Sequence, residues 1–212
     1  NAILGFSRLM KEAPDVTEEQ RKNLGIINVS GGHLLNLINN VLDISKIESG
    51  RMILEEVPLD LYQLLQEMRS LLYVSAKERG LNFFVEQSVE LPRRIEIDGR
   101  KLRQVLINLI GNAIKFTEHG GVMLRASVVN RKPPNKLRLR FEVEDTGPGI
   151  SEEDKQRLFK PFVQLKEMTS AENGTGLGLA ICRQYIDLMG GTIDVISKKG
   201  TGALFYFETP AK

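Results

Sequence analysis

A long heptad pattern near the start of the chain most constrains what it can fold into. Apolar residues recur every seven positions between about 18 and 48, which predicts one long helix whose stripe packs against other helices. Thr17 and Gln20 have the spacing of a capping box at its start, and Gly50 suits the C-cap. The stripe comprises Leu24, Ile27, Leu34, Leu37, Ile38, Val41 and Ile44.

A second helical pattern covers residues 1–12, and "EAPDV" separates it from the long helix. No cap residue stands before "NAILGFSRLM", so we expect this helix to be the continuation of a longer one. Two helices cannot enclose a core alone. We therefore expect a helical hairpin that forms half of a dimeric four-helix bundle. The alternative is a hairpin packed against the rest of its own chain.

Charge and cysteine content exclude several classes of protein. Lys and Arg number 29 against 27 Asp and Glu, a balance that predicts no nucleic-acid partner. Cys182 is the one cysteine, which excludes an internal disulfide, and its helical context predicts buried packing. No apolar run approaches the ~20 residues that span a bilayer. We expect a cytoplasmic location without membrane contact, although the parent protein could be membrane-anchored.

From residue 51 onward strand and helix patterns alternate, which predicts an α/β sandwich with a mixed sheet and one helical layer. The fold class expected for the whole chain is α+β, with domains at 1–50 and 51–212. Expected strands are "MILEEV", "NFFVEQS", "RRIEI", "VMLRASVV", "KLRLRFEVED", "TIDVIS" and "ALFYFET". Expected helices are "LDLYQLLQEMRSLLYVSAKERG", capped by Asp60 or a neighbour, "DGRKLRQVLINLIGNAIKF", "SEEDKQRLF" and "GLGLAICRQYIDLMGG".

The helix "LRQVLINLIGNAIKF" carries an unusual polar face. Asn108, Asn112 and Lys115 stand at i, i+4 and i+7, which places them on one side of the helix. Two amides in an apolar helix are costly unless they find partners. An amide oxygen is a ligand for Mg²⁺, and a lysine neutralises phosphate. A polar face satisfied within the protein remains the alternative.

In "VEDTGPGI" a strand ends in an acid and two glycines. Asp145 could accept a hydrogen bond from an exocyclic amine such as that of adenine, while Gly147 and Gly149 permit close backbone approach to a flat ligand. The alternative is an ordinary turn headed by aspartate.

In "ENGTGLGLAI" glycines at 174, 176 and 178 precede a helix, where backbone N–H groups can hold phosphate. The segment is neither a Walker loop nor a complete dinucleotide fingerprint.

In order, the Asn–Asn–Lys helix, Asp-x-Gly-x-Gly, "LFKPFVQ" and Gly-x-Gly-x-Gly resemble the N, G1, F and G2 boxes of sensor histidine kinases. The resemblance covers nearly the whole chain. It implies a catalytic ATP-binding domain of the Bergerat type at 51–212. Residues 1–50 resemble the dimerisation and histidine-phosphotransfer hairpin of the same family.

The resemblance also implies roles for individual residues. Asn112 would hold Mg²⁺, Asp145 would read adenine, and a lid at about 163–173 would cover the phosphates of ATP. Phe159 and Phe162 would pack at the lid base or, alternatively, in the core, and Lys160 and Lys166 would be solvated or reach phosphate. The implied nucleotide-binding residues are Asn108, Asn112, Lys115, Asp145, Gly147, Gly149, Phe162, Gly174, Thr175, Gly176, Leu177 and Gly178.

Related ATPases carry Glu where this chain has Asn108, and an amide cannot act as a general base. Histidine phosphorylation with relay to a response-regulator receiver domain is therefore favoured over hydrolysis. A nucleotide-gated dimeric scaffold without phosphotransfer is the alternative. Ala203 replaces a Ser or Thr that is common in the family.

The acceptor histidine is expected to be absent from this chain, which leaves no catalytic residue to name. His33 is followed by Leu34 rather than by an acid, and His119 lies in a turn. In the family a stretch like "NAILGFSRLM" directly follows the box that contains the acceptor. We therefore expect the acceptor to lie upstream of residue 1.

Overall fold

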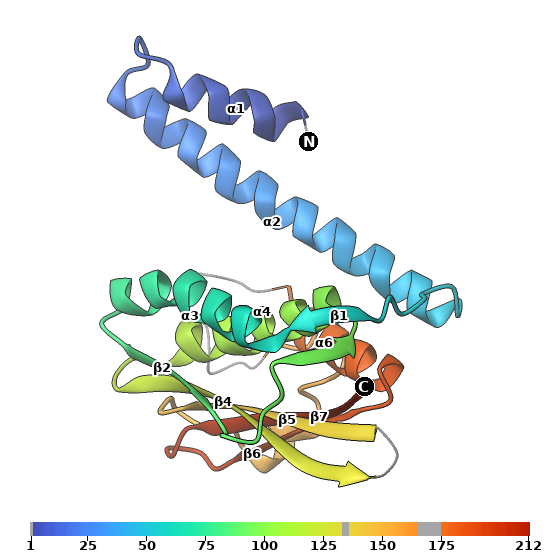
Figure 1. Ribbon diagram of the computed structural model, residues 1–212. Coiled ribbons are helices and arrows are strands. Elements are labelled where there is room, and N and C mark those ends of the chain that lie inside the picture. Colours follow the sequence, from blue (N-terminus) through green and yellow to red (C-terminus); the bar gives the residue numbers. More distant parts are fainter. Residues whose placement is uncertain (1, 133–135, 165–174) are drawn as a thin grey trace. The chain divides into compact units, whose positions relative to one another are not determined.

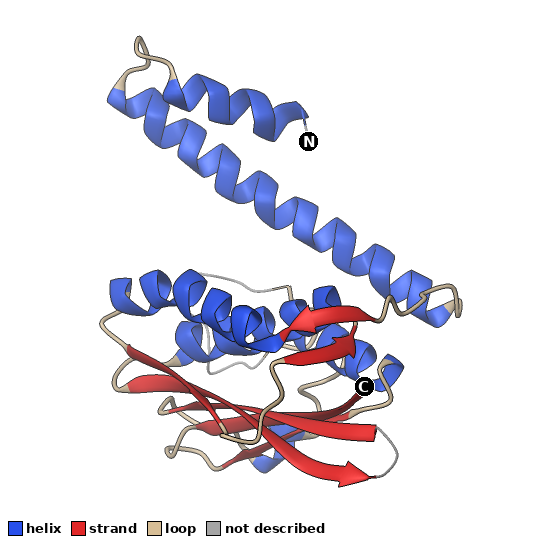
Figure 2. Ribbon diagram, in the orientation of Figure 1, coloured by secondary structure: helices blue, strands red, loops and turns tan. Residues whose placement is uncertain are grey.

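The computed structural model describes residues 2–132, 136–164 and 175–212, and the chain divides into two compact units, Asn1–Met52 and Ile53–Lys212. The first unit contains helices α1 (Ala2–Glu12) and α2 (Glu18–Glu48), which pack against each other as a hairpin (Figure 1). The second unit combines strands and helices (Figure 2). A helical region followed by an α/β unit is the fold class predicted from the sequence, and it is confirmed.

Helix α2 begins and ends where the heptad pattern predicts, but its C-cap is Ser49, and Gly50 is the next residue, with φ +66°. Its N-terminus carries the predicted capping box: Gln20 N donates to Thr17 Oγ1 at 3.2 Å, and Thr17 N donates to Gln20 Oε1 at 2.9 Å. The two helices approach closely at Gly31, where an added Cβ would lie 2.5 Å from Leu4 Cδ2. Local capping therefore sets the start of the helix, and a small residue permits the hairpin to pack.

Much of the α2 stripe is exposed within the hairpin. Ile27 is 44% exposed, Leu34 59% and Val41 49%. Leu24, by contrast, is 9% exposed, and its backbone oxygen accepts a hydrogen bond from Ser7 Oγ at 3.3 Å. A contiguous apolar stripe of this kind is typical of a surface that another molecule covers.

A five-stranded sheet with the order β2-β4-β5-β7-β6 is the scaffold of the second unit. Strand β2 is parallel to β4, and the other neighbours are antiparallel, so the sheet is mixed as predicted. A small antiparallel sheet pairs β1 with β3. The strands are β1 (Val57–Asp60), β2 (Asn82–Gln87), β3 (Arg94–Ile97), β4 (Gly121–Lys132), β5 (Lys136–Asp145), β6 (Thr192–Ser197) and β7 (Ala203–Ala211).

Helices α3 (Leu61–Glu78), α4 (Gly99–Phe116) and α6 (Gly178–Leu188) form one layer on this sheet (Figures 1 and 2). The core lies between the two layers. There the rings of Phe141 and Phe207, from neighbouring strands, stack with their centroids 4.9 Å apart. The single helical layer that the sequence predicts is therefore present.

Two acidic N-caps place the helices of this layer. Asp60 Oδ1 accepts a hydrogen bond from Gln63 N at 3.0 Å, as predicted for the start of α3. Asp98 Oδ1 accepts one from Lys101 N at 3.1 Å at the start of α4. Each cap satisfies a backbone donor that the first turn of a helix leaves without a partner.

The strand predicted over "MILEEV" is not formed, because side chains at the start of α4 take the bonds that a strand partner would make. Residues 51–56 have no regular structure, and the strand begins at Val57. Glu55 N donates to Asp98 Oδ2 at 3.1 Å, and Lys101 Nζ donates to Ile53 O at 3.5 Å.

Two further predictions concern irregular segments. The helix predicted from "SEEDKQRLF" is limited to its first turn, α5 (Glu152–Lys155), which Ser151 caps by accepting from Asp154 N at 3.2 Å. The "RKPPN" turn between β4 and β5 includes residues 133–135, which lie outside the described residues.

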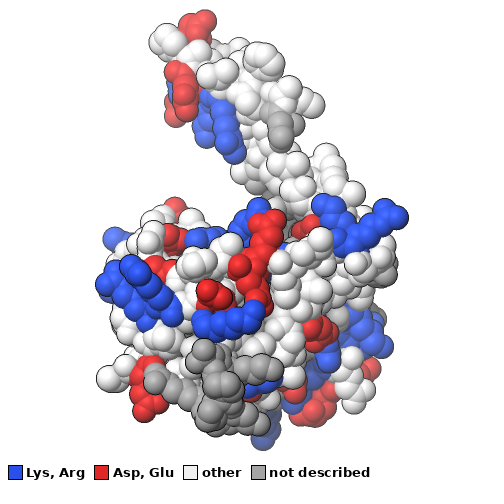
Figure 3. All heavy atoms as spheres, turned by 45° about the vertical axis from the view of Figure 1, so that its right-hand side comes forward, with Lys and Arg blue, Asp and Glu red and all other residues white. Residues whose placement is uncertain are grey.

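Charged side chains on the sheet pair across strands. Arg125 Nη1 lies 2.6 Å from Glu144 Oε2, and Arg140 Nη1 lies 3.1 Å from Glu208 Oε1. Figure 3 shows Lys and Arg side chains lying among Asp and Glu side chains on the face that it presents. These partly exposed pairs satisfy opposite charges on adjacent strands but add little to stability.

Candidate functional site

Helix α4 carries the predicted polar face on its half-buried side. Asn108 Nδ2 donates to the backbone oxygen of Gly178 at 3.4 Å, across 70 positions of sequence. Asn108 Oδ1 accepts from Gln104 Nε2, also at 3.4 Å. Because Gly178 is the first residue of α6, Asn108 joins the polar face of α4 to the helix that follows the glycine-rich segment.

Asn112 and Lys115 lie further along α4, and both are half-buried. Lys115 Nζ lies 5.3 Å from the centroid of the Phe116 ring. An amide oxygen such as that of Asn112 suits Mg²⁺, which usually takes one or two protein oxygens together with phosphates and water. Within the described ranges no group of three or more His, Cys, Asp or Glu could hold a metal. The chemistry of Asn112, on a face that reaches the start of α6, fits a magnesium ion held together with phosphate.

The start of α6 has no side-chain cap, and its first residues are half-buried or buried. Its N-cap is Leu177, which has no side-chain capping bond, so the first N–H groups of the helix have no cap of the usual kind. Leu177 N itself donates to Thr175 Oγ1 at 3.2 Å. Helix N-termini with free N–H groups are common sites for phosphate. Gly174, the first glycine of the predicted phosphate loop, lies outside the described residues.

Gly176 requires the absence of a side chain. Its φ is +69°, and an added Cβ would lie 2.8 Å from the backbone carbon of Phe162. Phe162 N donates to Gly176 O at 2.9 Å, and Phe162 itself has φ +62°. A bulky residue with positive φ is strained, and strain of this kind clusters at ligand sites and switch segments.

Phe162 is 70% exposed, so the alternative that it is a core aromatic is wrong. Phe159 is half-buried. The guanidinium carbon of Arg183 lies over the Phe159 ring, 5.3 Å from the ring centroid. Lys160 is exposed. Lys166 and most of the predicted lid, residues 165–173, lie outside the described residues.

Asp145 ends β5 and is held by the backbone on both sides. Its Oδ1 accepts from Gly147 N at 2.8 Å and from Ala203 N at 3.2 Å. Burial raises the pKa of Asp145 above its ordinary value, although these two hydrogen bonds act in the opposite direction. Both bonds go to Oδ1, which leaves Oδ2 as a second acceptor for a donor such as an amine.

The glycines after Asp145 permit contact with the protein's own backbone. A Cβ at Gly147 would lie 2.9 Å from Asp145 Oδ1. Gly149 has φ +69°, and a Cβ there would lie 2.1 Å from the backbone oxygen of Lys198. The close neighbour of Gly149 that the structure describes is the turn between β6 and β7, and the approach of these glycines to a flat ligand stays a prediction.

A shallow depression adjoins this loop and is lined by Glu118, His119, Thr146, Gly147 and Pro148. Thr146 Oγ1 donates to His119 O at 2.7 Å and accepts from Gly121 N at 3.0 Å. The hydroxyl of Thr146 therefore fixes the loop after α4 against the Asp145 loop. His119 is exposed in that loop.

The remaining nucleophilic candidates have simple surroundings. Cys182 is fully buried, and its Sγ lies 3.9 Å from Val105 O. Burial raises the pKa of its thiol to about 12, so it is a packing residue, as predicted. His33 lies within α2, and its side chain lies outside the described part of the structure.

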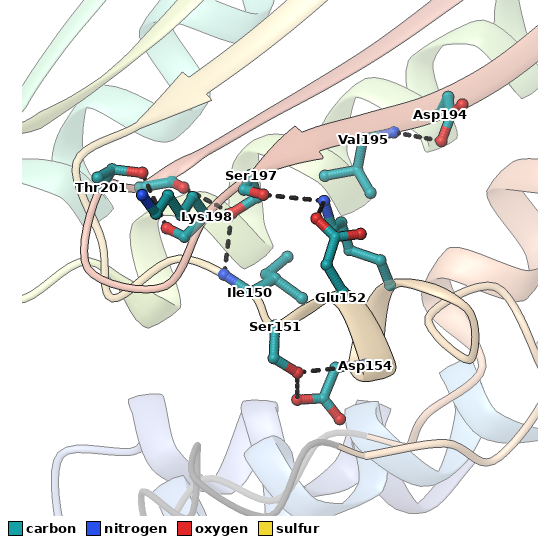
Figure 4. Close-up of polar contacts among 11 residues, drawn as sticks. Ile150, Ser151, Glu152, Asp154, Asp194, Val195, Ser197, Lys198 and Thr201 are labelled. Atoms are coloured by element: carbon teal, nitrogen blue, oxygen red, sulfur yellow. Dashed lines mark hydrogen bonds and ion pairs between the residues drawn. The ribbon is translucent and has the colours of Figure 1, made fainter.

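Two residues that make hydrogen bonds in this region were not predicted from the sequence. Gln104 holds Asn108, and the hydroxyl of Ser197 links the Asp145 loop to the turn between β6 and β7 (Figure 4). Gln104 stands one helical turn before Asn108, so its spacing was a usable signal. Ser197 had no such signal, because its partners Ile150 and Gly202 belong to different loops.

The chain matches two family models. Residues 97–212 match the model described as histidine kinase-, DNA gyrase B-, and HSP90-like ATPase, and residues 1–50 match the His Kinase A (phospho-acceptor) domain. The signal transduction histidine-protein kinase BarA of Escherichia coli (strain K12) is 39% identical over 210 residues. That match covers 98% of this chain and 22% of BarA, so the chain spans about a fifth of that relative.

Two solved structures resemble nearly the entire chain. Full-length ShkA in complex with AMPPNP has a TM-score of 0.80 and 38% identity, covering 99% of this chain and 42% of ShkA. Histidine kinase ThkA in complex with response regulator protein TrrA has a TM-score of 0.64 and 31% identity, covering 99% of this chain and 56% of ThkA.

Among the helices that the structure describes, none is long and apolar enough to cross a membrane.

Proposed function

The chain belongs to the sensor histidine kinases, and we propose that it binds ATP with Mg²⁺ and transfers the γ-phosphoryl group to a histidine. The bond between the γ-phosphorus and the oxygen that bridges it to the β-phosphorus breaks as the unprotonated ring nitrogen of the histidine bonds to the γ-phosphorus, the imidazole releases the proton of its other ring nitrogen, and ADP leaves. The observation that carries the proposal is the hydrogen bond from Asn108 to Gly178. It joins the polar face of α4 to a helix start suited to phosphate.

Each part of the nucleotide has a matching group in the proposed site. Asp145 Oδ2 would accept from the adenine amine, beside Gly147 and Gly149. Lys115 and the N–H groups around the start of α6 would hold the phosphates. Asn112 would hold Mg²⁺, and a bound magnesium ion would neutralise phosphate charge. Thr175, Gly176 and Leu177 would shape the loop over the phosphates.

Transfer is favoured over hydrolysis by the identity and bonding of residue 108. The amide of Asn108 accepts from Gln104 and donates to Gly178, and an amide has no basic group near neutral pH. It therefore orients neighbouring groups and does not activate a water molecule. Positioning and charge stabilisation are the main contributions that a protein makes to phosphoryl transfer.

We further propose that the phosphate acceptor is a histidine outside these 212 residues. His119 lies in an exposed loop that also lines the depression beside Gly147. In the sequence His33 stands between Gly32 and Leu34, and neither of these neighbours is an acid that could orient its imidazole. Neither context is that of an activated nucleophile.

Dimerisation and phosphate relay complete the proposal. The exposed stripe of α2 would pair with a second hairpin to give a four-helix bundle. ThkA has been solved in complex with a response regulator protein, which supports a receiver domain as the partner here as well. ATP supply and such a partner favour a cytoplasmic location.

A labelling experiment tests this function. A longer version of the protein, extended upstream of residue 1, is incubated with Mg²⁺ and ATP labelled at the γ-phosphate. We expect label on a histidine in the added segment, and none when Asn112 is changed to Ala. Equal labelling of the 212-residue chain on His33 would overturn the acceptor assignment.

A nucleotide-gated scaffold without transfer is the competing function. It gives tight ATP binding with no labelled histidine in the extended protein. Measuring ATP affinity and label incorporation on the same preparation separates the two functions.

A further inference from the structure

The hydroxyl of Ser197, the last residue of β6, bridges two loops that are far apart in the sequence (Figure 4). It accepts from Ile150 N at 2.9 Å and donates to Gly202 O at 2.6 Å. In addition, Lys155 Nζ donates to the backbone oxygen of Ser197 at 3.0 Å. One side chain therefore ties the loop after β5 to the turn before β7, using both its proton and a lone pair.

Both ends of this bridge adjoin the groups that hold Asp145. The donors to Asp145 Oδ1 are the backbone nitrogens of Gly147, which lies in the same loop as Ile150, and of Ala203, which follows Gly202. Ala203 on β7 stands opposite Asp145 on β5 and opposite Ser197 on β6. The position of the Ser197 hydroxyl is thus coupled to both donors.

The two loops also touch through their backbones. A Cβ at Gly149 would lie 2.1 Å from Lys198 O, and one at Gly202 would lie 2.0 Å from Asp145 O. Gly200 N donates to Pro148 O at 2.6 Å. Contacts this close leave no room for the turn to shift without moving the residues around Asp145.

We propose that Ser197 is a positioning residue for recognition of the nucleotide base. By joining Ile150 to Gly202 it fixes the two N–H groups that engage Asp145 Oδ1, and this directs Oδ2 toward the amino group of adenine. The inference rests on the proposed binding of ATP. Ser197 itself need not touch the nucleotide.

Base discrimination tests this role better than affinity alone. Inosine triphosphate carries an oxygen where ATP carries the amino group, so an oriented carboxylate accepts from ATP and not from inosine triphosphate. The Kd values of both nucleotides with Mg²⁺ are measured by calorimetry for the wild-type chain and for Ser197→Ala. We expect the wild type to prefer ATP, and Ser197→Ala to lose about three- to tenfold of that preference, the usual net value of one hydrogen bond.

Two variants separate positioning from general loosening of the turn. Ser197→Thr keeps the hydroxyl and should keep the preference. Thr201→Ala removes another hydroxyl bond of the same turn, from Thr201 Oγ1 to Lys198 O at 2.8 Å, and should also keep it. Asp145→Asn should lose the preference, and adding Ser197→Ala to it should cause no further loss.

The outcomes distinguish this inference from the function on which it rests. A wild-type chain that binds neither nucleotide contradicts the proposed function. A wild-type chain that prefers ATP, together with an unchanged preference in Ser197→Ala, contradicts the positioning role. Equal losses in Ser197→Ala and Thr201→Ala also contradict it. If Ser197→Ala does not fold, Ser197→Cys retains the volume with a weaker donor and should show a partial loss.

Discussion

The backbone nitrogen of Ala203 lies 3.2 Å from Oδ1 of Asp145, although 58 positions separate the two residues in the sequence. Ala203 replaces a Ser or Thr that is common in the family, so the chain has no hydroxyl at this position. Its contact with Asp145 is made through the main chain, which any residue except proline supplies. This hydrogen bond to the Asp145 carboxylate therefore does not depend on the side chain at position 203.

Acid should weaken ATP binding through Asp145. Because burial raises the pKa of this carboxyl, it takes up a proton at a higher pH than the ordinary ~3.9 of aspartate. In the proposed site the carboxylate accepts from the adenine amine, and its protonated form would be a poorer acceptor. ATP affinity should be flat above the raised pKa and fall about tenfold per pH unit below it. Calorimetry across this range tests the effect, and Asp145→Asn should bind weakly without this dependence.

Asn112→Ala should remove the magnesium-dependent part of ATP binding. Loss of a metal ligand should lower the affinity for Mg²⁺ by at least ~10-fold, because even a residue that only orients a metal ligand contributes that much to metal affinity. ATP affinity is measured with Mg²⁺ and with EDTA. Asn39→Ala, at an exposed position of α2, is the matched control and should behave as the wild type does. An unchanged response to Mg²⁺ in Asn112→Ala would exclude it as the ligand.

Gly149→Ala should destabilise the second unit more than Gly200→Ala. Both glycines have positive φ, which costs another residue about 1–2 kcal/mol. A Cβ at Gly149 would also meet Lys198 O at 2.1 Å, whereas nothing lies within 4 Å at Gly200. Urea denaturation followed by circular dichroism compares the two, because the chain has no Trp. Equal losses would show that the loop moves to accommodate the methyl group.

Asp98 should make the fold sensitive to acid. Its side chain is 1% exposed, and Lys101 Nζ lies 2.6 Å from Oδ2. Burial alone would raise the pKa of Asp98, but hydrogen bonds from Lys101 and from Glu55 N hold it below its ordinary value. Because the folded-state pKa is depressed, this stabilisation is complete above the unfolded pKa of ~3.9 and disappears as the pH falls through the folded pKa.

Asp98→Asn should therefore lower the free energy of unfolding at pH 7 by about 1–3 kcal/mol, the cost of an unsatisfied buried partner. Its Tm should also change less than that of the wild type between pH 5 and about pH 2, an acid range that includes the unfolded pKa. The control is Asp187→Asn, which loses only an exposed pair with Arg183 at 4.0 Å. A parallel Tm loss in both variants would contradict the role of burial.

The hairpin should carry the dimer contact. Leu34→Asp places a charge in the exposed stripe of α2 and should give a monomer, while the wild type shows twice the 23.8 kDa of one chain. Light scattering coupled to gel filtration measures both masses. Val89→Asp changes a fully exposed apolar residue of the second unit and should remain dimeric. A monomeric wild type, or a dimeric Leu34→Asp, would contradict this surface.

Helix starts were predictable because their signals are local. Thr17, Asp60 and Asp98 each cap a helix through a partner three residues away. The spacing of the apolar residues that follow then indicates that the segment is helical. The segment 52–57 was misread because its bonds come from Asp98, 43 positions later than Glu55. The exposure of Phe162 could not be predicted from the sequence either, because a large aromatic side chain ordinarily indicates a core position.

The sequence by itself determined the two-part organisation, the mixed sheet, the order of the nucleotide-box motifs and the family. These features depend on residue type and on spacing along the chain, and both can be read directly from the sequence. Only the tertiary structure decided that Asn108 bonds to Gly178, that Oδ1 of Asp145 is the engaged oxygen, and that Ser197 bridges two loops. A hydrogen-bond partner is selected by distance in space. The register of β5, β6 and β7 brings Asp145 and Ser197 close to their partners, and the packing of α4 against α6 brings Asn108 close to Gly178.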